Sequence, residues 1–165
     1  MESLVLDKEQ INNKIRRMAF QLLEHYHNEE KIIIVGIDGQ GYALAERLHS
    51  ILNKDSNLSS DLVKVSVNKE NPYNSEVELP LSKEEIENQT IIIVDDVLNS
   101  GKTMIYAIKA FLETQLKEIK SLVLVDRSHK RFPVKADFVG LSLATTLHEH
   151  IEVSLEANNE SVYLK

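Results

Sequence analysis

Residues 91–103 read Ile-Ile-Ile-Val-Asp-Asp-Val-Leu-Asn-Ser-Gly-Lys-Thr, and this stretch decides the fold expected for the whole chain. Its apolar, β-branched start is typical of a strand buried in a parallel sheet, and the amphipathic pattern that follows indicates a helix. The two acids therefore fall at the carboxyl end of a strand, which is where open α/β sheets bind their ligands. We accordingly expect a ligand site at this strand end.

The small residues after the acids are of the kind that binds phosphate. Ser100, Gly101 and Thr103 let backbone N–H groups close around a phosphate, and the N-terminus of the following helix adds a favourable dipole. Two carboxylates suited to hydroxyls or to a metal, Asp95 and Asp96, precede this cradle by a few residues. A ribose 5-phosphate requires this combination of groups.

Two other interpretations of the stretch are weaker. Gly-Lys-Thr also ends a nucleotide P-loop, but that motif requires a glycine five positions before its second glycine, where this chain has Asp96. The acid pair could instead belong to a strand-end turn, since Asp is common in turns. The order of strand, acids, loop and helix favours ligand binding over this simpler explanation.

Composition and charge are those of a single globular domain that covers residues 1–165. Apolar residues make up 42% of the chain and there is no cysteine, so we expect a sizeable core without disulfides or thiol chemistry. The chain begins without a basic signal segment, and no apolar run approaches the roughly 18 residues of a membrane span, so we expect a cytoplasmic protein. A net charge of −7 disfavours a protein that mainly coats nucleic acid.

Hydrophobic periodicity predicts alternating helices and strands, and hence an α/β fold. The first helix is expected over about residues 8–27, after a capping box that begins at Asp7. Near residue 82 the pattern Ser-x-x-Glu is suited to capping one helical turn. Further strands are expected at 32–35, 62–67 and 119–125, and further helices after Gly41 and over 103–114.

The stretch 91–103 resembles the thirteen-residue signature of type I phosphoribosyltransferases, which bind phosphoribosyl pyrophosphate (PRPP). The resemblance implies a mostly parallel sheet with helices on both faces and a small, reduced hood. It also implies that Asp95 and Asp96 hold the ribose hydroxyls and help to place Mg²⁺. The residues implied to bind the 5-phosphate are Asn99, Ser100, Gly101, Lys102 and Thr103.

Two further segments acquire roles only through this resemblance. The residues in the place of the loop that binds pyrophosphate through backbone amides are Asp38, Gly39, Gln40 and Gly41. Relatives carry Thr-Arg where this chain has Gly39-Gln40, so a bidentate guanidinium is missing. Residues 54–89 occupy the place of the hood and of a mobile loop that closes over PRPP, although a plain surface connection explains this acidic segment equally well.

Residues 126–140 sharpen the resemblance. They read Asp-Arg-Ser-His-Lys-Arg-Phe-Pro-Val-Lys-Ala-Asp-Phe-Val-Gly and look like the bifunctional pyrimidine-operon attenuators that are also uracil phosphoribosyltransferases. The residues implied to border the base pocket are Asp126, Arg127, Thr145 and Thr146. For the basic residues between 127 and 131, a basic surface loop and a role in binding an anion or RNA both stay open.

We therefore expect an enzyme that transfers the 5-phosphoribosyl group of PRPP to a nucleobase and releases pyrophosphate, with Mg²⁺ as cofactor. Purine enzymes of this class place an Asp where this chain has Asn99, which cannot take a proton at neutral pH, so uracil is favoured. The alternative is a catalytically weak regulator that senses PRPP or a nucleotide and binds the RNA of pyrimidine genes, although the net charge disfavours RNA. The family implies a homo-oligomer, either a dimer or a tetramer.

Overall fold

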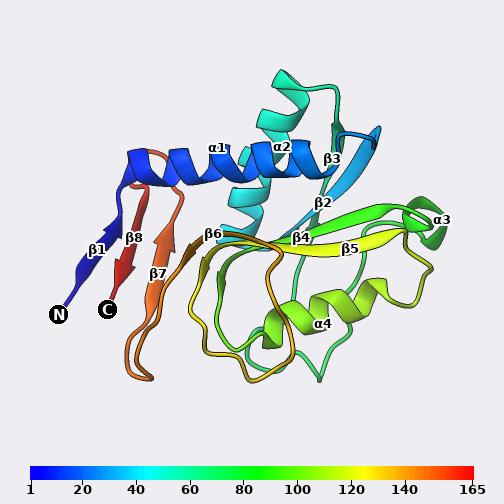
Figure 1. Ribbon diagram of the computed structural model, residues 1–165. Coiled ribbons are helices and arrows are strands. Elements are labelled where there is room, and N and C mark those ends of the chain that lie inside the picture. Colours follow the sequence, from blue (N-terminus) through cyan, green and yellow to red (C-terminus); the bar gives the residue numbers. More distant parts are fainter.

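The computed structural model describes residues 1–165, with every side chain except that of Asp55 (Figure 1). A five-stranded parallel sheet runs through the molecule in the strand order β3-β2-β4-β5-β6. Its strands are β2 (Lys31–Ile37), β3 (Ser59–Val65), β4 (Thr90–Leu98), β5 (Glu118–Asp126) and β6 (Phe138–Ser142). The expected strands are therefore present, although β3 begins and ends earlier in the chain than its alternating pattern indicates.

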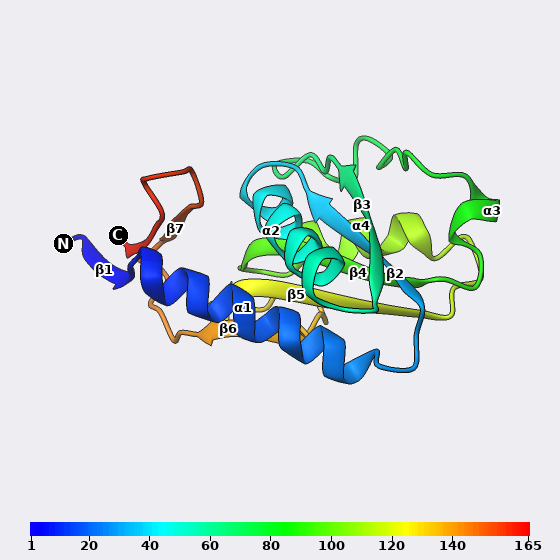
Figure 2. The ribbon, with the colours of Figure 1, turned by 90° about the horizontal axis from the view of Figure 1, so that it is seen from above.

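Helices cover both faces of the sheet. Helices α1 (Lys8–His25) and α2 (Gln40–Asp55) lie on one face and α4 (Lys102–Phe111) on the other, which Figures 1 and 2 show from two directions. The predicted capping box begins α1, because the Asp7 carboxylate accepts the Gln10 N–H at 2.9 Å and Gln10 Oε1 accepts the Asp7 N–H at 2.9 Å. The predicted α/β architecture is confirmed.

Burial on both faces explains why the central strands are apolar without interruption. The side chains of a strand alternate between the two faces of its sheet. In β4, Ile92 and Val94 pack in the core with α1 and α2, whereas Ile91 and Ile93 pack in the core with α4. All four side chains are fully buried. The acid pair of this strand thus comes directly after its buried apolar run.

A second, three-stranded antiparallel sheet is made by the two ends of the chain. Its strand order is β1-β8-β7, from β1 (Ser3–Leu6), β7 (Ile151–Ser154) and β8 (Ser161–Leu164). Both termini lie at this end of the molecule (Figure 1). These strands and β6 are not predicted from the sequence, because segments of four or five residues are too short to show a clear hydrophobic periodicity.

The segment 54–89, where a hood is expected, contributes to several elements. Residues Ser59–Val65 form the edge strand of the main sheet, because pairing with β2 buries Val63 and Val65. Residues 66–82 contain turns and bends only, and α3 (Lys83–Ile86) is the predicted single helical turn. Its capping box is formed in both directions, with the side chains of the residues at 82 and 85 each accepting a backbone N–H of the other.

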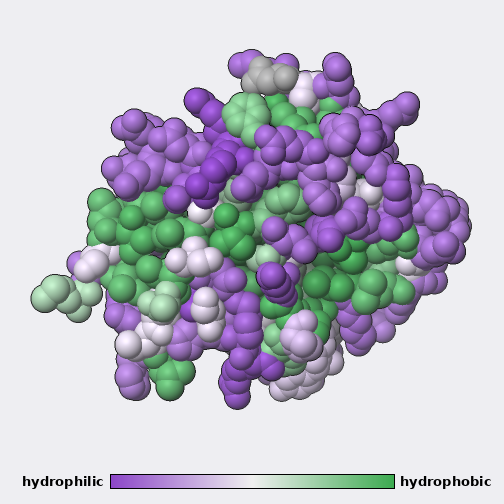
Figure 3. Space-filling model, viewed as in Figure 1, coloured by the Kyte–Doolittle hydropathy of each residue, from purple (hydrophilic) through white to green (hydrophobic). Residues whose placement is uncertain are grey.

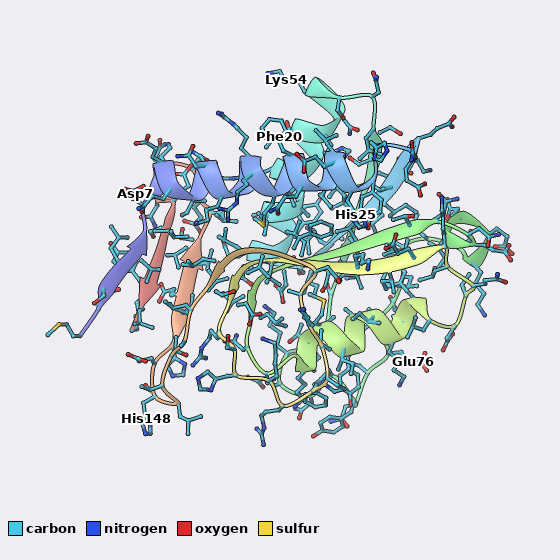
Figure 4. All side chains as sticks on the ribbon, viewed as in Figure 1. Asp7, Phe20, His25, Lys54, Glu76 and His148 are labelled. Carbon is cyan, nitrogen blue, oxygen red and sulfur yellow. The ribbon has the colours of Figure 1, made fainter. Side chains whose placement is uncertain are left out.

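The surface is mostly hydrophilic over the outer side of α1, and apolar residues gather over the small sheet (Figure 3). An exception on α1 is Phe20, labelled in Figure 4, which is 48% exposed. Single exposed apolar side chains of this kind are ordinary. Throughout the described part of the chain, no helix combines the length and the apolar character needed to cross a bilayer.

Helix α2 is tied to the small sheet through Arg47. Its Nη2 donates to the carbonyl oxygen of Leu155, just after β7, at 2.8 Å, and lies 3.3 Å from Glu160 Oε1, just before β8. The ammonium of Lys8 approaches the other oxygen of the same carboxylate at 3.5 Å. The side chain of Arg47 is 26% exposed and that of Lys8 57%, so the guanidinium makes the better shielded contact.

We expect Arg47→Met to loosen the small sheet. The variant keeps most of the apolar stem but loses a hydrogen bond from a charged donor, which contributes about 1.5–3 kcal/mol. Amide hydrogen exchange should become faster in β7 and β8 while β4 stays protected, and thermal denaturation should begin at a lower temperature. Lys8→Met is the matched control, with an effect below about 1 kcal/mol. Equal effects of the two variants would contradict the proposed tie.

Candidate functional site

The predicted site lies where the order of strands in the main sheet reverses. The chain passes from β2 to β3 on one side and then to β4 on the other side of β2. The loops that leave β2 and β4 therefore diverge, and open α/β sheets bind ligands in the crevice at such a point. The predicted ligand segments 38–41 and 95–103 both lie at this edge of the sheet.

Asp95 is the buried member of the acid pair. It is 4% exposed, whereas Asp96 is only partly buried, and Asp95 Oδ1 accepts the backbone N–H of Asp96 at 2.9 Å. The first turn of α2 packs closely against the same carboxyl group. A Cβ added to Gly41 would lie 2.8 Å from Asp95 Oδ1 and 3.0 Å from the Val94 carbonyl oxygen. The absence of a side chain at position 41 thus lets the loop after β2 approach the acids.

Burial raises the pKa of the Asp95 carboxyl well above the usual aspartate range, and the negative charge of Asp96 raises this pKa further. The positive charge of Lys69 acts in the opposite direction. A carboxyl group in this environment gains from a ligand that donates hydroxyl hydrogen bonds or brings a cation, because either favours the ionised form. The acid pair is therefore suited to a ribose diol or to a divalent cation.

The loop after the acids has the backbone of a phosphate cradle. Gly101 is the N-cap of α4, has a left-handed φ of 87° and provides no side-chain cap. The carbonyl oxygen of Ser100 accepts the N–H groups of Arg131 and Phe132, at 2.8 Å and 3.0 Å, which holds the loop in place. Ser100 Oγ accepts the Lys102 N–H at 3.3 Å. Because the N-cap residue Gly101 has no side-chain acceptor, the N-terminal dipole of α4 and the next amides of its first turn are left for an anion.

The acids and the cradle line one pocket of about 150 Å³. Its lining includes Asp95, Asp96 and the whole predicted loop from Asn99 to Thr103. Two lining residues come from outside the segment 95–104 and are not predicted: Lys69, from the loop between β3 and α3, and Ile151, the first residue of β7. The sequence does carry a signal for Lys69, since it is the only Lys or Arg in residues 66–82.

The predicted pyrophosphate loop lies beside this pocket and does not line it. The N–H of Gly39 donates to Asp38 Oδ1 at 2.9 Å, and Gly39 has a left-handed φ of 98° as the N-cap of α2. The side chain of Gln40 is turned to the other end of the chain, where its Oε1 accepts the backbone N–H of Leu155 at 2.7 Å. At the position where the resemblance implies an Arg, this chain therefore has a side chain that binds the C-terminal segment.

Arg127 joins the phosphate loop to the segment predicted to border the base. It is 9% exposed and donates to Asn99 Oδ1 at 3.0 Å and to Thr145 Oγ1 at 3.0 Å. Its Nη2 also donates to the carbonyl oxygens of Thr146, at 3.3 Å, and Glu149, at 2.5 Å. The expectation of a basic surface loop or of an RNA contact is wrong for this residue, because its guanidinium is buried and bound to four internal acceptors.

Asp126 is separate from this group. Its Oδ1 accepts the N–H of Ser128 at 2.9 Å and pairs with the ammonium of Lys130. Of the four residues predicted at the base pocket, the structure thus brings Arg127, Thr145 and Thr146 together through hydrogen bonds, while Asp126 contacts the following turn.

The donor set at the strand end fits a magnesium ion. Mg²⁺ is commonly held by one or two carboxylates together with waters and substrate phosphates, and two adjacent carboxyl groups stand here beside a phosphate cradle. Among the described residues there is no group of three or more His, Cys, Asp or Glu side chains that could hold a metal.

Comparison with known proteins assigns the class. Residues 3–158 match the family model of the phosphoribosyl transferase domain, and the chain belongs to this family. Its relatives include the Bifunctional protein PyrR of Haemophilus ducreyi, which is 32% identical over 94% of this chain and 91% of its own length. The protein of the same name from Clostridium kluyveri is 29% identical over 99% of this chain and 98% of its own. The resemblance stated from the sequence is confirmed.

Solved structures of other family members share the fold. The hypoxanthine phosphoribosyltransferase of Trypanosoma cruzi superimposes with a TM-score of 0.78 at 16% identity, over 98% of this chain and 95% of its own. A hypoxanthine-guanine phosphoribosyltransferase of Bacillus anthracis gives a TM-score of 0.73 at 18% identity, over 97% and 95%. Identities this low support the fold and carry no conclusion about the base.

We expect Asp95→Asn to stabilise the ligand-free protein at neutral pH. The amide keeps an oxygen for the Asp96 N–H but has no charge to desolvate. Because the folded-state pKa of Asp95 lies above its unfolded value, its ionisation opposes folding as the pH rises through the folded-state pKa. The gain in the free energy of unfolding, about 1.4 kcal/mol for each unit of raised pKa, should therefore shrink as the pH falls toward about 4.

Urea unfolding of the wild type and the variant between about pH 4 and pH 8 measures this difference. A variant that is less stable than the wild type at every pH would show that the Asp95 carboxylate is held by favourable contacts that outweigh its burial.

Proposed function

We propose that this protein transfers the 5-phosphoribosyl group of PRPP to a nucleobase, with uracil as the preferred base, and releases pyrophosphate. The observation that carries the proposal is the single pocket in which the Asp95–Asp96 pair lies beside the backbone of Ser100 and Gly101. Membership of the phosphoribosyltransferase family supports the reaction type. The name of the relatives, Bifunctional protein PyrR, is in keeping with a second, regulatory role.

Different residues of the pocket bind different parts of PRPP in this reaction. The backbone of Ser100 to Thr103 binds the 5-phosphate, and the acid pair binds the ribose hydroxyls. The bond from C1 to pyrophosphate breaks as a bond to a base nitrogen forms, and the ring gains positive character as in glycoside chemistry. The carboxylates of Asp95 and Asp96 face the ring and stabilise that charge. Mg²⁺, when bound, would neutralise part of the charge on the departing pyrophosphate.

The choice of a pyrimidine base rests on Asn99. Its Oδ1 accepts from Arg127 Nη1 at 3.0 Å, which orients the amide so that Nδ2 is left for a ligand. An amide has no proton-accepting chemistry at neutral pH, so it cannot act as the base that a purine N7 site would use. Nδ2 can donate to a carbonyl oxygen, a group that uracil offers twice.

A second function is supported by the side chain of Gln40. Its bond to Leu155 leaves the loop 38–41 without a cationic group for pyrophosphate, and the loss of one such preorganised donor lowers a rate by about 10²–10³. A catalytically weak protein that senses PRPP or a nucleotide and regulates pyrimidine genes is compatible with this loss. An RNA contact near the site would have to use the exposed Arg131, since Arg127 is buried and Lys130 is paired.

We expect Gly101→Val to weaken PRPP binding more than Lys102→Ala does. A β-branched side chain is strained at a left-handed φ, and its Cβ would lie 3.3 Å from the Phe132 carbonyl oxygen. The ammonium of Lys102 donates instead to the Glu70 carbonyl oxygen at 3.3 Å. Isothermal titration with PRPP and Mg²⁺ compares the two variants. A much larger loss for Lys102→Ala would mean that a side chain, and not the backbone, holds the phosphate.

We expect slow turnover of uracil with PRPP and none of hypoxanthine or guanine. A panel of free bases with radiolabelled PRPP, run beside PRPP titration, separates the two proposed functions. The double variant Asp95→Asn, Asp96→Asn is the control, because each lost charge-assisted hydrogen bond removes about 1.5–3 kcal/mol of binding.

Purine turnover above uracil turnover would refute the base assignment. PRPP binding without turnover of any base would move the protein to the sensing class. Unchanged PRPP affinity in a folded double variant would refute the site itself.

A further inference from the structure

Two side chains of α2 bind the backbone of one residue, Leu155, which follows β7. Gln40 Oε1 accepts the N–H of Leu155 at 2.7 Å, and Arg47 Nη2 donates to the carbonyl oxygen of Leu155 at 2.8 Å. Gln40 and Arg47 are about two helical turns apart, so they lie on the same face of α2. Leu155 is buried, and buried backbone groups require hydrogen-bonding partners. Helix α2 therefore fixes the chain just after β7 at two points.

The opposite end of β7 borders the pocket. Ile151, the first residue of this strand, lines the pocket together with the acid pair and the phosphate loop. Every residue of β7 pairs with β8, so the strand moves as one unit over the roughly 13 Å between Ile151 and Leu155. A shift of the chain at Leu155 is therefore passed on to Ile151. The position of this wall of the pocket depends on the contacts between α2 and Leu155.

The predicted pyrophosphate loop is fixed without the side chain of Gln40. The N–H of Asp38 donates to the carbonyl oxygen of Val65, the last residue of β3, at 2.8 Å. At the other end of the loop, Gly41 packs against Asp95 at the end of β4. The backbone of the loop thus has contacts of its own with β3 and β4. The side-chain amide of Gln40 acts on the C-terminal segment, and its removal leaves the loop in place.

We propose that Gln40 is a positioning residue for the ribose 5-phosphate part of PRPP, because it holds β7 and Ile151 in place beside the pocket. This inference rests on the proposed function. Gln40 does not itself line the pocket, so it acts through Leu155 and β7. An arginine could not replace it in this role, because a guanidinium has no acceptor for the Leu155 N–H. The glutamine at position 40 thus has a function of its own, besides the loss of a cation.

The test compares Gln40→Met and Arg47→Met with Lys8→Met, a matched change of the exposed cation beside Glu160. Isothermal titration in the presence of Mg²⁺ uses PRPP, ribose 5-phosphate and inorganic pyrophosphate as probes. The first two variants each lose one of the two bonds to Leu155, so each should weaken ribose 5-phosphate binding by about three- to tenfold. Pyrophosphate binding should stay within about twofold in all variants, as should every affinity of the Lys8 variant.

Hydrogen exchange of the Leu155 N–H reports the contact itself. A contact that favours binding is strengthened by the ligand to the same extent, so saturating ribose 5-phosphate should slow this exchange in the wild type by about three- to tenfold. Gln40→Met should lose this effect of the ligand. Gln40→Glu should keep it, because a carboxylate oxygen can accept the same N–H. A residue that only stabilised the small sheet would leave the ligand without influence on this exchange.

The outcomes separate this inference from the proposed function. If Gln40→Met weakens ribose 5-phosphate binding and Arg47→Met does not, the route through Leu155 is refuted and the proposed function stands. Equal losses for ribose 5-phosphate and pyrophosphate, unchanged affinities in both variants, or an equal loss in Lys8→Met would also refute the inference alone. If the wild type binds none of the three probes, the proposed function fails and the inference fails with it.

Discussion

The close packing of the first turn of α2 against the end of β4 is the constraint on which the site depends. Position 41 has room only for a hydrogen atom beside the carboxyl of Asp95 and the carbonyl of Val94. This contact buries one acid of the pair, sets its environment and brings the loop after β2 next to the loop after β4. Both loops leave the sheet at its switch point, so one steric requirement joins the two predicted ligand segments.

A buried arginine organises the other side of the pocket. The guanidinium of Arg127 has donors in several directions, and it binds the phosphate loop at Asn99 and the segment before β7 at Thr145 and Thr146. A buried cation is stable only when such acceptors surround it. The desolvation cost of burying this charge is offset by these hydrogen bonds, which also fix this border of the pocket. The small terminal sheet continues this border, because its strand β7 contributes Ile151 to the pocket lining.

The fold was largely predictable because its central strands are buried on both faces. Uninterrupted apolar runs such as 91–94 and 122–125 have no other stable place than the middle of a covered sheet. The terminal strands were not predictable for the opposite reason. Strands β1, β7 and β8 have four residues each and pair with segments far away in the sequence, so their stability comes from partners that local periodicity cannot reveal.

The sequence by itself determined the parallel sheet, the acid pair at a strand end and the glycine that opens the phosphate loop, because each depends on residues close together in the chain. Only the tertiary structure decided where the polar side chains of the site point. Gln40 meets Leu155, and Arg127 meets the segment 145–149, while Lys69 reaches the acids from a different loop. The physical reason is that a polar side chain takes the partner that packing brings within hydrogen-bonding distance, and that partner lies in a distant part of the chain.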